Sequence, residues 1–116
     1  MAEDLLVSRV RSYSSGVPGR ALNQARTNHF VIDSSTNPEA VSTVESFLAG
    51  VSACGVTMIE GIARSDGLPL TRMEASIEGV RLASESNAFK EVNMRFELAG
   101  LSQEQAEQLI QTYRNR

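Results

Sequence analysis

The chain has 116 residues, of which 41% are hydrophobic and 22% are charged, and its formal net charge is −3. This composition is that of one soluble domain, and the lack of a basic excess argues against nucleic acid or an anionic membrane as a partner. One cysteine and one histidine exclude an internal disulfide and a cysteine-only zinc site, so we expect no metal and no cofactor. The acidic start has no apolar signal core and, with the single cysteine, indicates a cytoplasmic protein.

The first part of the chain predicts two extended segments before a helix. The first covers residues 5–13 and ends at the turn-forming run SSGVPG, residues 14–19. The second covers residues 20–33 and has its strongest strand pattern at HFVID. The run SSTNP at residues 34–38 then breaks the strand and leads to the helix.

The stretch from Ser42 to Asp66 predicts one long helix. Ser42 and Glu45 form a Ser-x-x-Glu capping box at its start, and Gly67 provides a stop after its end. With a rise of about 1.5 Å per residue, such a helix is about 38 Å long. A compact chain of this length is about 35 Å across, so the helix would cross the whole subunit.

This predicted helix is apolar nearly all round, with Glu60 as the single charge between Phe47 and Ala63. Its apolar residues do not fit one stripe: Val44, Phe47, Leu48, Val51, Val56, Met58, Ile59 and Ile62. Such a helix needs burial on every side, which a second copy can supply, and small residues such as Gly50 allow close approach. We therefore predict a homodimer. The run is shorter than a confident membrane span, so we expect a buried helix and no membrane insertion.

The second half predicts an antiparallel hairpin and a final helix. Residues 70–80 and 91–98 alternate apolar and polar side chains and are joined by the turn SESN. The apolar phase slips near the end of the first run, so Gly79 is expected at a bulge. Ser102 begins a capping signal for a helix over about 102–115. The order β-β-α-β-β-α predicts an α+β domain, with an antiparallel sheet packed on the long helix.

Four residues are candidates for chemistry: Cys54, Arg20, Arg26 and Glu45. Cys54 lies in the middle of the helix among small and apolar neighbours, where a buried structural cysteine is the alternative to a reactive thiol. A reactive thiol must ionise, and in apolar surroundings it needs a nearby cation. Arg20 or Arg26 could supply that cation and hold a peroxide oxygen, or could simply be solvated. Glu45 is a capping carboxylate that could also orient an arginine.

The stretch VESFLAGVSACGVTMIEGIARSDGLPL resembles the central helix of the OsmC/Ohr family, the osmotically inducible and organic hydroperoxide resistance proteins. That family's pattern has a carboxylate near the helix start, a small residue before a cysteine, and a Gly-Leu-Pro-Leu exit into a strand. Upstream, ARTNHFVIDSS resembles the family's second strand. Downstream, LTRMEASIEGVR and FKEVNMRFELAGLSQEQAEQLIQ resemble its hairpin and following helix. We therefore expect a single OsmC-like domain over residues 1–116.

The resemblance implies an OsmC-like fold in which two subunits intertwine and their central helices pack together. It implies a thiol-dependent peroxidase that reduces organic hydroperoxides, with Cys54 as the attacking thiol. The family's arginine is matched by Arg20 or Arg26, and its glutamate by Glu45, one residue later than usual. The family's resolving cysteine follows the last helix, about where this sequence ends. Either the protein is a shortened form that lacks this C-terminal segment, or further residues follow Arg116 in the natural protein. As written, the sequence has no resolving thiol, so we expect an external thiol reductant. The alternative function is a non-catalytic dimer that binds a small apolar ligand or serves in stress without an activity of its own.

Overall fold

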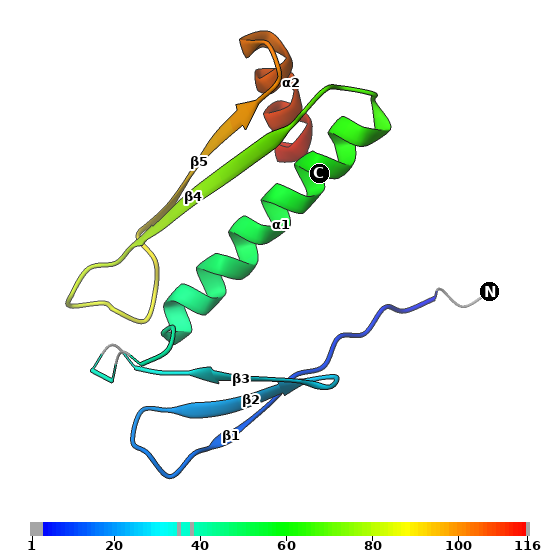
Figure 1. Cartoon of the computed structure of the whole chain (residues 1–116). Coiled ribbons are helices and arrows are strands. Elements are labelled where there is room, and N and C mark those ends of the chain that lie inside the picture. The colour runs from blue at the N-terminus through cyan, green and yellow to red at the C-terminus, as the bar shows by residue number, and fades with distance from the viewer. Residues whose placement is uncertain (1–3, 35, 38, 116) are drawn as a thin grey trace. The chain divides into compact units, whose positions relative to one another are not determined.

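The computed structural model describes residues 4–34, 36–37 and 39–115. The chain divides into two compact units, Met1–Ser46 and Phe47–Arg116, and each is described by itself. Figure 1 shows the order of the elements: three strands precede a long helix, and a hairpin and a second helix follow it. Two helices with antiparallel sheets confirm the predicted α+β class.

The N-terminal unit contains one antiparallel three-stranded sheet in the order β1-β2-β3. Strand β1 is Arg11–Ser14, β2 is Ala21–Ala25 and β3 is Asn28–Ile32. The strand predicted over residues 5–13 is therefore present only in its last part, because only that part pairs with β2.

The predicted single extended segment over residues 20–33 is wrong, because the chain reverses between β2 and β3. Arg26 adopts a left-handed conformation with φ 58° in this turn. The Asn28 side chain closes the turn by donating to the carbonyl oxygen of Ala25 at 3.2 Å. The turn contains no Gly or Pro, which are the strongest local turn signals, so the sequence pattern does not reveal it. The observed order is β-β-β-α-β-β-α.

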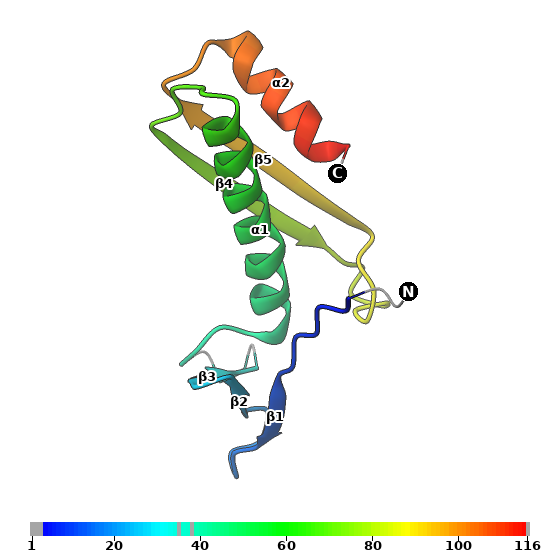
Figure 2. The ribbon, with the colours of Figure 1, turned by 90° about the vertical axis from the view of Figure 1, so that its right-hand side faces the viewer.

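The second unit contains most of helix α1, Thr43–Ser65, followed by strands β4, Arg72–Val80, and β5, Glu91–Ala99. Helix α2, Gln103–Arg114, ends the described fold. The two helices and the antiparallel hairpin confirm the prediction for this half of the chain. Figures 1 and 2 show the hairpin lying along α1, with α2 beside the C-terminal half of α1.

The core of the second unit forms where α1, the hairpin and α2 meet. Its buried side chains are Ile59, Ile62 and Ala63 of α1 and Leu109 of α2. Partly buried apolar residues surround them: Leu68, Leu70, Met73, Phe96, Leu98, Leu101, Ile110 and Tyr113. Gly55 lies at the close approach of the three elements, because a Cβ there would be 3.2 Å from both Met94 Cε and Tyr113 Oη. The missing side chain lets the hairpin and α2 pack directly on α1.

The bulge predicted at Gly79 is wrong. Strands β4 and β5 pair without interruption, and Gly79 lies opposite Val92 in that register. The ring of Phe89 occupies the space that a side chain at position 79 would fill. The shift in apolar phase therefore reflects the end of the strand and the packing of Phe89, and no extra residue is inserted in the ladder.

Helix α1 is only partly covered by its own chain. Phe47 is 59% exposed although its ring stacks on that of Phe89, with centroids 6.0 Å apart. Among the described residues, α1 is long and apolar enough to cross a bilayer, a test that core helices of soluble proteins also pass. Within the chain, 22% of its most apolar window is buried. Exposed apolar surface of this kind is where a partner would bind, and the homodimer stays a prediction.

Candidate functional site

Cys54 lies in the middle of α1 and its side chain is exposed, unlike the buried structural cysteine that the sequence also allowed. The buried positions of α1 include Gly55, Ile59 and Ile62, so Cys54 lies beside the face that packs on the hairpin. Its carbonyl oxygen accepts a hydrogen bond from Thr57 Oγ1 at 3.3 Å. An exposed thiol can meet a reagent from solvent, which a buried structural thiol cannot.

The thiol of Cys54 faces a second sulfur atom. Its Sγ donates to Sδ of Met58 at 3.5 Å. The two residues are four apart and therefore lie on the same face of the helix, one turn from each other. In the sequence, Met58 stands out only as one of the apolar positions of the predicted helix. The Cys-x-x-x-Met spacing within a predicted helix is the signal that could have identified it.

Arg20 is bound by two carboxylates of its own unit. Its Nε donates to Oδ1 of Asp33 at 3.2 Å and its Nη2 donates to Oδ2 at 3.0 Å, which is a bidentate pair. The same Nη2 lies 3.3 Å from Oε1 of Glu39. Asp33 directly follows β3 and Glu39 lies shortly before α1, so Arg20 joins both ends of this connection. The side chain of Asp33 is completely buried, and that of Arg20 is 20% exposed.

The ion pair shifts the pKa of each side chain so that its charged form is favoured. The hydrogen bond from Arg20 lowers the pKa of Asp33 below its ordinary value of 3.8, although burial acts in the opposite direction. The hydrogen bond to Asp33 likewise raises the pKa of Arg20 above its already high ordinary value. Both side chains are therefore charged at neutral pH, and the positive charge of Arg20 is compensated within its own unit.

Arg26, the other predicted arginine, occupies the turn between β2 and β3 and is exposed. Its carbonyl oxygen accepts a hydrogen bond from Nε2 of Gln24 at 3.3 Å. The ion pairs within the described part of the chain do not involve its guanidinium. Of the two predicted arginines, Arg26 is therefore the one whose charge is not engaged by a described carboxylate.

Glu45 forms the predicted capping box at the start of α1. Its Oε1 accepts from the backbone N–H of Ser42 at 2.9 Å, and Oγ of Ser42 accepts from the backbone N–H of Glu45 at 3.1 Å. In an α-helix, positions nine residues apart are separated by about 13.5 Å along the axis and lie on opposite faces. Glu45 and Cys54 have this spacing, so they are not neighbours along α1.

The four predicted residues fall into the two units, with Cys54 in the second unit and Arg20, Arg26 and Glu45 in the first. Their joint action on a peroxide therefore stays a prediction. The sequence pattern did not reveal Asp33 and Glu39 as partners of Arg20. A charged residue directly after the apolar run HFVI is the available signal for Asp33, because a carboxylate continuing a strand into the interior needs a cation.

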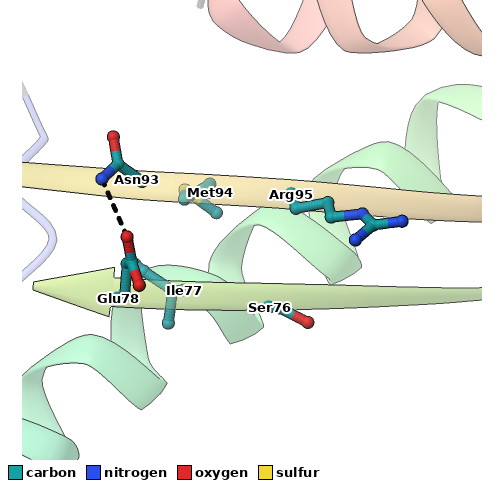
Figure 3. A pocket seen from close by; sticks show the side chains of 6 residues that line it. All are labelled: Ser76, Ile77, Glu78, Asn93, Met94 and Arg95. Atoms are coloured by element: carbon teal, nitrogen blue, oxygen red, sulfur yellow. Dashed lines mark hydrogen bonds between the residues drawn. The ribbon is translucent and has the colours of Figure 1, made fainter.

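A shallow hollow of about 370 Å³ lies on the hairpin. Figure 3 shows its lining residues, Ser76, Ile77, Glu78, Asn93, Met94 and Arg95. Four of these six are polar, and Asn93 Nδ2 donates to Glu78 Oε1 at 3.1 Å across the strands. The exposed lining of the hollow is nevertheless mainly apolar, so it does not argue against the alternative of a small apolar ligand. Among the described residues, no three His, Cys, Asp or Glu side chains are grouped to hold a metal ion.

Comparison with protein families matches residues 35–116 to the OsmC-like proteins. This region is more than half of the chain and includes Cys54, the hairpin and α2. The chain belongs to the OsmC-like family. The family predicted from the central helix is thus confirmed. No curated protein matches this OsmC-like chain.

Solved structures share the OsmC-like fold. The OsmC like protein of Mycoplasma pneumoniae has a TM-score of 0.85 and 12% identity, over 96% of this chain and 82% of its own. An organic hydroperoxide resistance protein OsmC of Legionella pneumophila has a TM-score of 0.75 and 18% identity, over 97% of this chain and 85% of its own. A Psychrobacter arcticus protein named for osmotic stress induction and a detoxification response has a TM-score of 0.73 and 17% identity, over 97% of this chain and 84% of its own. These likenesses confirm the predicted OsmC-like fold.

Proposed function

We propose that this OsmC-like protein is a thiol-dependent peroxidase that reduces organic hydroperoxides through Cys54. The observation that carries the proposal is the exposed thiol in the middle of α1, within the region that matches the family. The names of the Legionella and Psychrobacter proteins refer to organic hydroperoxide resistance and to stress and detoxification. They support a role in the defence against oxidative stress, which we propose takes place in the cytoplasm.

The proposed reaction has two stages. The thiolate of Cys54 attacks the terminal oxygen of an alkyl hydroperoxide, the O–O bond breaks, and the alkoxide leaves and takes a proton to become an alcohol. Cys54 is then a sulfenic acid. A first external thiol displaces water from it to form a mixed disulfide, and a second thiol releases the Cys54 thiol and the oxidised reductant. One hydroperoxide and two thiols thus give an alcohol, water and a disulfide.

The attacking thiolate needs positive charge nearby, and the proposal gives this role to an arginine of the N-terminal unit. Arg20 is compensated by Asp33 and Glu39, whereas the Arg26 guanidinium is not engaged by a described carboxylate. Arg20 therefore suits a role in holding the connection before α1, and Arg26 has the charge available for a thiolate or a peroxide oxygen. In either case the arginine acts as a hydrogen-bond donor to developing negative charge.

The proposed peroxidase is a homodimer. The apolar surface of α1 is only partly covered by its own chain, and Phe47 remains exposed. Because Glu45 and Cys54 lie on opposite faces of one helix, a carboxylate of this kind would assist the thiol of a second subunit. The dimer would therefore cover the apolar helix and complete the site together.

The test is hydroperoxide consumption by the purified protein with a dithiol reductant. The wild-type protein should consume cumene hydroperoxide catalytically. In Cys54→Ser this rate should fall at least about a hundredfold, because the variant lacks the nucleophilic thiol. Cys54→Ser changes one exposed atom, so its circular dichroism and unfolding midpoint should stay unchanged. A Cys54→Ser variant that consumes hydroperoxide as fast as wild type would refute the proposal.

A further inference from the structure

The pair of sulfur atoms on α1 points to a second participant in the proposed reaction. We infer that the Met58 thioether accepts the oxygen of the Cys54 sulfenic acid, so that Met58 becomes methionine sulfoxide and Cys54 returns to the thiol. This inference rests on the proposed peroxidase function and adds an acceptor for the oxidised state of Cys54 within the same helix.

The geometry that carries the inference is the contact between the two side chains. The Sγ of Cys54 lies 3.5 Å from Sδ of Met58 and donates its hydrogen to it. Both atoms lie on one helix face, one turn apart. An oxygen bonded to Sγ takes the place of the thiol hydrogen and can be turned toward Sδ by rotation about the Cβ–Sγ bond of Cys54.

Exposure and conformational freedom favour the same pair. Cys54 is exposed and Met58 is partly buried, so a peroxide can reach the thiol while the thioether stays beside it. Methionine is unbranched and has three rotatable bonds, which lets its sulfur follow the oxidised cysteine. The other described methionines, Met73 and Met94, are also partly buried but lie on β4 and β5. Neither forms a described hydrogen bond with the Cys54 thiol.

The oxygen transfer is balanced in atoms and electrons. A lone pair of Met58 Sδ attacks the sulfenic oxygen, the Sδ–O bond forms, and the Sγ–O bond breaks. The bonding pair returns to Sγ, which takes up the hydroxyl proton and becomes the thiol. Sδ is oxidised by two electrons and Sγ is reduced by two. Together with the peroxide step, one alkyl hydroperoxide and Met58 give one alcohol and methionine sulfoxide.

Methionine sulfoxide has its own route back to methionine. Methionine sulfoxide reductases restore the thioether, whereas a sulfenic acid that meets more peroxide proceeds to the irreversible sulfinic and sulfonic acids. Transfer to Met58 would therefore place the oxidation on a residue that the cell can repair. The reductant of the proposed peroxidase would then include the enzymes that reduce methionine sulfoxide, besides a free thiol.

The test treats the full chain with one equivalent of cumene hydroperoxide and locates the added oxygen by peptide mass spectrometry. In wild type, we expect one added oxygen on Met58, with Met73 and Met94 as internal controls that stay unmodified. In Cys54→Ser, oxidation of Met58 should fall at least about tenfold, because the oxygen arrives through Cys54. In Met58→Leu, a swap that conserves volume, trapping of the Cys54 sulfenic acid by dimedone should increase.

The outcomes separate this inference from the peroxidase proposal. Equal oxidation of Met58 in wild type and in Cys54→Ser would mean direct attack by the peroxide and would overturn the inference. A Cys54 that dimedone traps while Met58 stays unmodified, with the same trapping in Met58→Leu, would also overturn it and leave the peroxidase function standing. A Cys54 that the hydroperoxide does not oxidise would overturn both.

Discussion

The two units bury different chemistry. In the described part of the N-terminal unit, the buried side chains are polar, Asn23 and Asp33. In the second unit they are aliphatic, as in Ile59 and Leu109. Hydrogen bonds and an ion pair therefore specify the first unit, whereas apolar packing holds the second. The candidate thiol Cys54 belongs to the second unit, and the candidate arginines belong to the first.

This difference separates groups that fix structure from groups that are available to react. Asn23 accepts from Ser12 Oγ at 2.6 Å and donates to the carbonyl oxygen of Phe30 at 3.2 Å, so its polar atoms are used inside the sheet. Arg20 is used in the same way by Asp33. Cys54 is exposed, and its thiol contacts one weak acceptor. The polar atoms of Asn23 and Arg20 in the first unit are therefore committed to the fold, whereas the thiol of Cys54 in the second unit remains exposed.

The largest expected effect concerns the apolar unit. Ile59→Ala removes a side chain with 0% exposure from the contact between α1, the hairpin and α2, and should lower the free energy of unfolding by about 2–5 kcal/mol. Phe47→Ala is the matched variant on the same helix, because Phe47 is 59% exposed. If the chain were a monomer, Phe47→Ala should cost much less. Urea unfolding measures both, and equal losses at low protein concentration would contradict the assigned core.

The next prediction concerns the uncovered face of α1. Gly50→Leu should weaken the proposed homodimer by at least about tenfold in dissociation constant, or 1.4 kcal/mol, because a bulky side chain blocks close helix approach. Nothing in the structure lies within 4 Å of a Cβ at position 50, so in a monomer the change should stabilise the helix by up to about 1 kcal/mol. The sign of the effect distinguishes the two. Sedimentation equilibrium and the concentration dependence of the unfolding midpoint measure it.

The two arginines provide a third contrast. Arg26→Ala should slow the reaction of Cys54 with hydroperoxide about tenfold or more, since a charge-assisted hydrogen bond contributes about 1.5–3 kcal/mol. Because Arg26 lies in an exposed turn, the unfolding midpoint should change little. Arg20→Ala should instead lower the stability of the N-terminal unit, because it leaves Asp33 buried without its cation. If the peroxide rate is unchanged in both variants, neither arginine acts on the thiol.

The smallest expected effect is in the acid range. Because the pKa of Asp33 is lowered by folding, its carboxylate stabilises the folded state above its ordinary value of 3.8, and this contribution is lost as the pH falls through the lower folded value. Asp33→Asn should remove that part of the pH dependence and reduce stability at neutral pH. Glu39→Gln is the control, because Glu39 is 81% exposed and its pair with Arg20 is a surface contact. Equal acid profiles for wild type and Asp33→Asn would contradict the assigned role of the pair.

Much of the second unit was predictable because its signals are local. The capping box at Ser102 forms as the sequence indicates, and alternation identifies β4 and β5. The capping box at Ser42, at the end of the first unit, is equally local and also forms. The prediction of a bulge at Gly79 was wrong because the sequence pattern cannot show that the ring of Phe89 fills the space beside this glycine. In the first unit, the turn at Arg26 was not predicted, because an arginine in the left-handed conformation cannot be recognised from the residue types around it.

The candidate site was predictable only in part. The family pattern identified Cys54, and the comparison with OsmC-like proteins confirms the family. The partners of Arg20 were not predictable, because Asp33 and Glu39 are 13 and 19 residues away in sequence and their pairing depends on the path of the connection before α1. Met58 was masked by its apolar character, which fits a core position as well as a contact with a thiol.

The central claim is that Cys54 is a reactive thiol, and the rate of its first oxidation tests this most directly. Reduced protein is mixed with cumene hydroperoxide in a stopped-flow instrument, and the loss of the thiol is compared with that of free cysteine at the same pH. We expect the Cys54 rate constant to exceed that of free cysteine by at least about a hundredfold, or about 2.7 kcal/mol in activation free energy. A rate constant equal to that of free cysteine would contradict the proposed peroxidase and leave Cys54 as an exposed but unactivated residue of α1.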